Sequence, residues 1–83
     1  MDVIGSQVTG DLTVVNDAQY NNVFAENVTV SENVMVRIFG IIKNDLIVKQ
    51  GATVYLHGRY NGKIINEGGV IYVFHPNGSI TSH

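Results

Sequence analysis

The feature that most restricts the fold of this chain is an apolar pattern that repeats every eighteen residues. Val28, Leu46 and Ile64 occupy the same place in three successive rows, and the rows keep their spacing without a gap. The other aligned columns are Val34, Ala52 and Val70; Val36, Val54 and Tyr72; and Ile38, Leu56 and Phe74. Fixed repeats of this kind are typical of stacked architectures, because one repeat alone cannot bury its apolar face. We therefore expect residues eighteen apart to be direct neighbours.

Within each row the apolar residues alternate with other residues, which is the period of a strand and not of a helix. Val, Ile, Tyr, Phe and Thr dominate the rows, and these residue types favour strands. The sequence therefore predicts an all-β fold, a short right-handed parallel β-solenoid with about 18 residues per coil and polar caps. A chain of 83 residues is long enough for one domain, here 1–83. It divides into an irregular N-terminal coil (1–27), regular coils (28–75) and a C-terminal cap (76–83).

The first coil follows the repeat less strictly than the others. Its apolar residues resemble the later pattern at a spacing of sixteen residues, and several Asn, Asp and Gln side chains make it unusually polar. The matched residues are Leu12, Val14, Ala18 and Tyr20, against Val28, Val30, Val34 and Val36. Polar terminal coils are expected in a solenoid, because they protect the unpaired strand edges at its ends.

Two other folds are compatible with parts of the sequence. Asn61-Gly62 and Asn77-Gly78 are strong signals for tight hairpins, which favour an antiparallel meander or a small barrel. A left-handed solenoid of hexapeptide repeats also has eighteen residues per coil, but there the residue after each inward aliphatic is usually small. Bulky residues such as Met35, Ile47 and Arg59 occupy those positions here, which favours the right-handed form.

One segment carries a resemblance to a known family. The run from Gly51 to Gly58 (GATVYLHG), followed by Asn61-Gly62-Lys63-Ile64 and Asn66-Glu67-Gly68-Gly69, resembles the coils of bactofilin-type right-handed β-helices. The resemblance covers about residues 28 to 80 and consists of aliphatic and glycine positions. It implies a β-helical scaffold that forms polymers and has no enzymatic activity.

Composition excludes several classes of protein. The chain has no Cys, so a disulfide framework and a thiolate zinc site are both excluded. No apolar run is long enough for a transmembrane helix, and we expect no membrane association. The opening MDVIGSQ has no basic start and no apolar stretch, so we expect a cytoplasmic protein without a signal peptide. The net charge of −2 does not favour nucleic-acid binding.

No group of residues forms a recognisable catalytic or cofactor motif, and we expect a protein that is not an enzyme and holds no cofactor. His57 and His75 are eighteen residues apart, so the repeat predicts that they are stacked neighbours on an outer face. Two imidazoles could share a metal ion, but a metal site usually needs a third ligand, so we assign no metal site. A metal-assisted enzyme that uses this pair is the most distant hypothesis.

Charge and exposed apolar residues point instead to a protein partner. Residues 1–36 hold five carboxylates and no Lys or Arg, whereas residues 37–83 have a formal charge of +3. Outward aliphatic and aromatic residues should form columns, and contiguous apolar patches usually mark an interface. The expected columns are Ile47 with Ile65, Met35 with Ile71, and Tyr55 with Val73. The partner-binding residues predicted in this way are Asp11, Asp17, Glu26, Glu32, Met35, Ile47, Tyr55, Ile65, Ile71 and Val73.

The sequence therefore leads to two hypotheses about function. The first is a non-enzymatic, cytoplasmic inhibitor or immunity-type protein that neutralises a partner such as a basic nuclease toxin, with the acidic coils steering the encounter. The second is a bactofilin-like scaffold that assembles with copies of itself.

Overall fold

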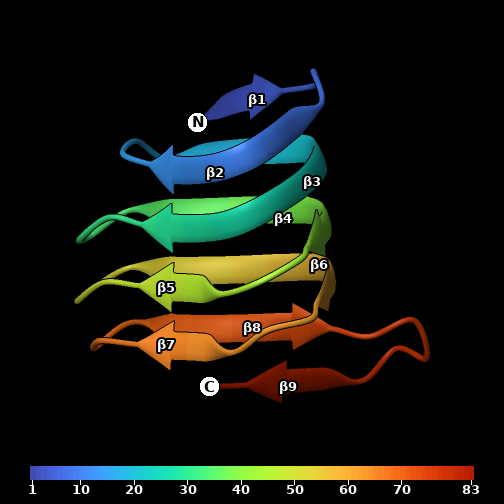
Figure 1. Ribbon diagram of the computed structural model, residues 1–83. Coiled ribbons are helices and arrows are strands. Elements are labelled where there is room, and N and C mark those ends of the chain that lie inside the picture. The colour runs from blue at the N-terminus through green and yellow to red at the C-terminus, as the bar shows by residue number, and fades with distance from the viewer.

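Stacked coils of short β-strands make up the computed structural model, which describes residues 1–83. The chain descends from coil to coil between its two termini, and every strand pair is parallel except the last (Figure 1). The predicted all-β parallel solenoid is thereby confirmed, with about 18 residues per turn and four turns, while its right-handedness stays a prediction. The strands are β1 (Asp2–Ile4), β2 (Val8–Val14), β3 (Ala18–Val30), β4 (Met35–Ile42), β5 (Leu46–Val48), β6 (Thr53–Tyr60), β7 (Ile64–Asn66), β8 (Val70–Phe74) and β9 (Ile80–Ser82).

Each regular coil contributes three stretches of strand, and equivalent stretches lie directly above one another. In consecutive coils the first stretch is 2–4, 18–20, 36–38, 54–56 and 71–73; the second is 8–10, 23–25, 40–42 and 58–60; the third is 12–14, 28–30, 46–48 and 64–66. Long strands such as β3 run through more than one stretch (Figure 1). Surface side chains one coil apart are therefore held in contact by the backbone ladder.

The interior consists of aliphatic columns and contains no buried polar or charged residue. Val36, Val54 and Ile71 form one such column, and all three are fully buried. Full burial of an aliphatic side chain of this size contributes about 1.5–3 kcal/mol. The alternation read from the sequence therefore identifies the core correctly over the regular coils 28–60.

Two glycines are required by the close approach of neighbouring coils. A Cβ at Gly40 would collide with the carbonyl oxygen of Val23, and a Cβ at Gly58 would collide with the carbonyl oxygen of Gly40. The backbone at Val23 and Gly40 cannot move away from such a side chain without breaking the hydrogen bonds between neighbouring coils. The surface above this glycine column consequently has no side chains.

The last coil departs from the predicted register by one residue. Val54 pairs with Ile71 and Leu56 with Val73, a spacing of seventeen, so the expectation that Ile71 and Val73 face outward is wrong. Both are in the core, at 0% and 2% exposure, while Tyr72 and Phe74 face outward. The expected pairing of Tyr55 with Val73 is wrong for the same reason.

A shorter corner produces this shift. Val48 and Asn66 are paired in neighbouring coils, and Gly69 lies against Ala52. Three residues separate Val48 from Ala52, but only two, Glu67 and Gly68, separate Asn66 from Gly69. The Asn66 side chain stabilises the tight corner, because its Oδ1 accepts hydrogen bonds from the backbone N–H groups of Gly68 (3.0 Å) and Gly69 (2.7 Å).

The first coil confirms part of the predicted spacing. Leu12 and Val14 pair with Val28 and Val30 at the expected distance of sixteen residues. Ala18 pairs with Val36 instead of Val34, because the corner before it is shorter than the equivalent corner in the next coil. A register irregularity between Tyr20 and Val23 follows in the same strand.

The C-terminal segment turns back on the last coil. β9 pairs antiparallel with β8, and the Asn77-Gly78 signal correctly predicts the turn between them. Asn61-Gly62, by contrast, forms a corner of the solenoid and not a hairpin, with the Gly62 N–H donating to the Asn44 carbonyl at 2.9 Å. None of the elements is a helix of the length and apolarity required to cross a bilayer.

Candidate functional site

The outward side chains of β4, β6 and β8 form a surface that we call the aromatic face. Its members alternate with the buried columns, and each is half-buried or exposed. No carboxylate belongs to this surface. Its three columns are Met35, Thr53 and Val70; Arg37, Tyr55 and Tyr72; and Phe39, His57 and Phe74.

Rings on the aromatic face stack along the solenoid axis. The His57 ring lies between Phe39 and Phe74, with centroid distances of 4.5 Å and 4.2 Å and interplanar angles of 9° and 11°. Tyr55 and Tyr72 stack beside them at 5.4 Å. The His57 ring therefore has both faces covered, and each other ring in these stacks has at least one face covered.

Cationic side chains border the rings. The Arg37 guanidinium lies 5.3 Å from the centroid of the Tyr55 ring, an arrangement stabilised by the ring quadrupole. The two salt bridges of the protein join Lys43 to Glu26 and Lys49 to Glu67, so both Arg37 and Arg59 lack a carboxylate partner. Partial burial, and secondarily the charge of Arg37, lowers the pKa of His57 below its ordinary value of 6.5. This shift favours the neutral imidazole of His57.

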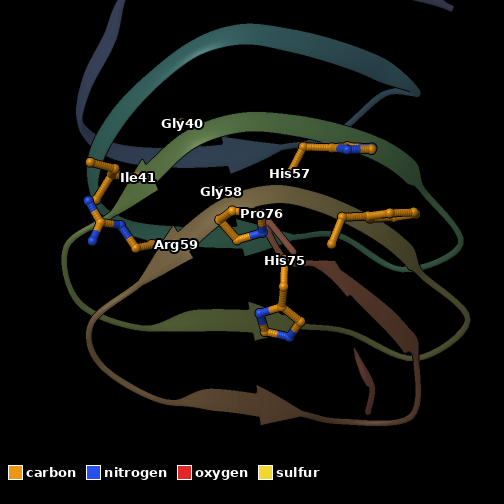
Figure 2. Close-up of a pocket in the computed structure, with 8 residues that line it drawn as sticks. Gly40, Ile41, His57, Gly58, Arg59, His75 and Pro76 are labelled. Carbon is orange, nitrogen blue, oxygen red and sulfur yellow. The ribbon is translucent and has the colours of Figure 1, made fainter. Parts of the chain in front are cut away.

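A groove runs beside the ring column, above the glycines that lack side chains. Gly40 and Gly58 form its floor, His57 and Phe74 one wall, and Arg59 with Ile41 the opposite wall. Figure 2 shows Ile41 and Arg59 on the side away from His57, with Pro76 and His75 at one end. The hollow has a volume of about 480 Å³ and is open to solvent.

The two histidines do not form the stacked pair that the repeat predicts. Because of the shorter last coil, His57 is paired with Phe74, and His75 lies beyond β8 in the turn before β9. The His75 Nε2 atom is 2.8 Å from the hydroxyl of Thr81. No group of three or more potential ligands in the protein is arranged to hold a metal ion.

The acidic residues predicted to bind a partner have roles within the fold. Asp11 accepts hydrogen bonds from Asn27, Asp17 accepts one from the Met35 N–H at 2.9 Å, and Glu26 pairs with Lys43. Glu32 is exposed in a corner and makes no ion pair. Hydrogen bonds from amides leave the negative charges of Asp11 and Asp17 in place, whereas the Lys43 ammonium offsets that of Glu26.

A ladder of Asp and Asn side chains at one corner was not recognised in the sequence. The Asn27 N–H donates to Asp11 Oδ1 (3.3 Å), the Asp45 N–H to Asn27 Oδ1 (3.2 Å) and the Lys63 N–H to Asp45 Oδ1 (3.0 Å). Each side chain thus satisfies a backbone donor in the next coil. The signal was the spacing of sixteen and then eighteen residues between three short polar acceptors.

Four predicted apolar residues do lie outside the core. Met35 and Tyr55 belong to the aromatic face, and Ile47 and Ile65 are neighbours on the third stretch, as expected. Ile65 is 37% exposed. The aromatic face also contains Arg37, Phe39, Tyr72 and Phe74, which the sequence prediction omitted.

Comparisons with known proteins do not extend these observations. No protein-family model, no curated protein and no solved structure matches the chain. The short β-solenoid is established by the strand pairing, and the likeness to bactofilins remains a resemblance of pattern.

Proposed function

We propose that this chain is a non-enzymatic protein-binding β-solenoid of the inhibitor or immunity kind, which neutralises a partner protein. The observation that carries the proposal is the aromatic face, where Tyr, Phe and Arg side chains adjoin one another across three coils. Aromatic residues and Arg are enriched at the centres of protein interfaces, and Lys and acidic residues are depleted there. The composition of this surface is that of an interface core.

The openness of the groove beside the aromatic face also supports a protein partner over a small molecule. Pockets for small ligands enclose most of the surface of the ligand, whereas the groove beside the rings is open. Stacked rings are already held in place by the β-ladder, so little side-chain entropy is lost when a partner covers them.

Charge supports a basic partner for the opposite part of the molecule. Residues 1–36 carry five carboxylates without Lys or Arg, and Lys43 offsets only Glu26 among them. An acidic end of this kind would steer a basic protein, such as a nuclease toxin, toward the solenoid.

The test is co-purification from the native host with a Tyr72→Lys variant and a matched control. Tyr72 is on the aromatic face, whereas Thr13, the control position for Thr13→Lys, is exposed on the third stretch of the first coil. We expect one stoichiometric partner with the parent and the control, and its loss with Tyr72→Lys. Retention of the partner by a folded Tyr72→Lys variant would contradict the proposal.

Self-assembly is a second candidate function, because the two ends of the solenoid keep unpaired strand edges. β2 has no neighbour beyond the first coil and β7 has none beyond the last, and Leu12 and Ile64 end the same aliphatic column half-buried. Such edges are templates for pairing with another copy. Sedimentation velocity over a range of concentrations distinguishes the two candidates: growing polymers would support a scaffold, and a constant monomer would rule it out.

A further inference from the structure

We infer that the aromatic face and its groove bind a carboxylate-bearing segment of the partner protein. This inference rests on the proposed function, since it names the chemistry that the protein-binding surface would recognise. The segment would lie along the groove over Gly40 and Gly58, with a carboxylate at Arg59 and an apolar or aromatic side chain against His57 and Phe74.

The orientation of the rings favours an anionic group. An aromatic ring has a negative face and a positive edge. Stacking covers both faces of His57 and the inner faces of Phe39 and Phe74, so the side of the column that meets solvent consists of ring edges. A row of such edges is complementary to carboxylate oxygens.

The arrangement of charges points to the same ligand class. Arg37 and Arg59 border the rings and have no ion-pair partner, while two of the three lysines are neutralised by glutamates elsewhere. No Asp or Glu lines the groove. A guanidinium offers paired donors that match a carboxylate in plane and spacing, so each of the two arginines could pair with a carboxylate of the partner.

The same geometry argues against a nucleic acid. Proteins that hold single strands do so by stacking bases on exposed aromatic faces. Tyr55 lies between the Arg37 guanidinium and the Tyr72 ring, and His57 is enclosed on both faces, so these two central rings offer no free platform for a base. An acidic peptide needs only the edges and the guanidinium groups.

The experiment measures fluorescence anisotropy of three labelled probes with the purified protein. The probes are a six-residue peptide of alternating Glu and Tyr, the same peptide with Gln in place of Glu, and a six-nucleotide oligothymidine. The variants are Arg37→Gln, Arg59→Gln and the control Lys63→Gln, whose residue carries an unpaired charge outside the groove. Circular dichroism checks that each variant is folded.

We expect the Glu peptide to bind more tightly than the Gln peptide, and each arginine variant to weaken it about fivefold, as for an exposed ion pair. Lys63→Gln should leave the affinity unchanged at moderate salt. Equal affinity for the Glu and Gln peptides, or no binding of the Glu peptide, would overturn the inference. Tighter binding of oligothymidine, weakened by the same arginine variants, would also overturn it and assign the surface to nucleic acid.

These outcomes are separate from the fate of the proposed function. If the host partner is lost with Tyr72→Lys but the peptides do not discriminate charge, the surface binds protein by another chemistry. If the partner is retained with Tyr72→Lys, the proposed function itself fails, whatever the peptides do.

Discussion

The corner built by Asp11, Asn27 and Asp45 and the ring column built by Phe39, His57 and Phe74 join the same coils in opposite ways. At the corner, each polar side chain accepts a hydrogen bond from the backbone of the next coil. In the ring column, the side chains stack on one another across the coils, and the rings are only half-buried. The comparison teaches that a polar surface residue of a solenoid can be structural, while an apolar one can be free for a partner.

The largest expected effect tests whether the rings are truly outside the core. Ile71→Ala should lower the free energy of unfolding by about 2–5 kcal/mol, because it opens a cavity among fully buried aliphatics. Tyr72→Ala, its immediate neighbour, should cost about 1 kcal/mol through the loss of one stacked pair. Urea unfolding of both variants measures the difference in stability. A larger loss for Tyr72→Ala than for Ile71→Ala would indicate that Tyr72 is buried, as the register of eighteen residues requires.

A second prediction concerns the corner ladder. Asp45→Ala should cost about 1–2 kcal/mol, because the Lys63 N–H loses its acceptor. Asp45→Asn keeps a carbonyl oxygen at the same place and should be close to the parent in stability. If both substitutions were equally destabilising in thermal unfolding, the negative charge and not the hydrogen bond would hold the corner.

The third prediction uses the lowered pKa of His57. The unfolded chain binds a proton at the ordinary pKa of 6.5, while the folded protein binds it at lower pH, so protonation favours unfolding. The contribution of neutral His57 to the free energy of unfolding should be fully present above pH 6.5. It should fall as the pH decreases from 6.5 toward the pKa of the folded protein, and the loss should level off below that pKa. Thermal unfolding at pH 7.5 and pH 5.5 measures the loss. A His57→Phe variant keeps an aromatic ring in the stack and should lack the pH-dependent loss of stability that protonation of His57 causes.

The smallest effect is expected for the ion pair between Glu26 and Lys43. These side chains are 44% and 36% exposed, so solvent screens their attraction across the 2.9 Å contact. Glu26→Gln retains an oxygen for the Asn44 amide and should change stability by less than about 1 kcal/mol. A larger loss of stability that disappears at high salt would mean that the attraction between Glu26 and Lys43 stabilises the acidic coils more than an exposed ion pair normally does.

Most of the architecture could be predicted from the sequence because aliphatic columns must recur wherever coils stack. Val36 with Val54 and Leu46 with Ile64 are neighbours, as the period of eighteen requires. The register of residues 70–74 could not be predicted from the sequence, because all five residues are apolar and either alternation would place apolar side chains in the core. The corner before this strand is one residue shorter than the equivalent corner of the previous coil, and this determines which alternation is buried. Its only signal in the sequence is Asn66, whose side chain forms the turn.

The candidate surface was less predictable for the same reason. Tyr55 and Met35 lie in regular coils and were identified, whereas Tyr72 and Phe74 were assigned to the interior. Once the last coil moves by one residue, His75 leaves the ring column and Phe74 takes its place. The unrecognised shift at a single corner therefore made both the predicted stacking of His57 with His75 and the predicted outward columns of the last coil wrong.

The uniformly apolar strand β8 also has a consequence for how the chain reaches its native state. A strand that is apolar on both sides can dock on β6 in two registers that differ by one residue. The slipped register would force the rings of Tyr72 and Phe74 into space shaped for Ile71 and Val73, and overpacking of this kind is costly. The short corner at Gly69 and the antiparallel pairing with β9 are both compatible with the native register, so they favour it over the slipped one.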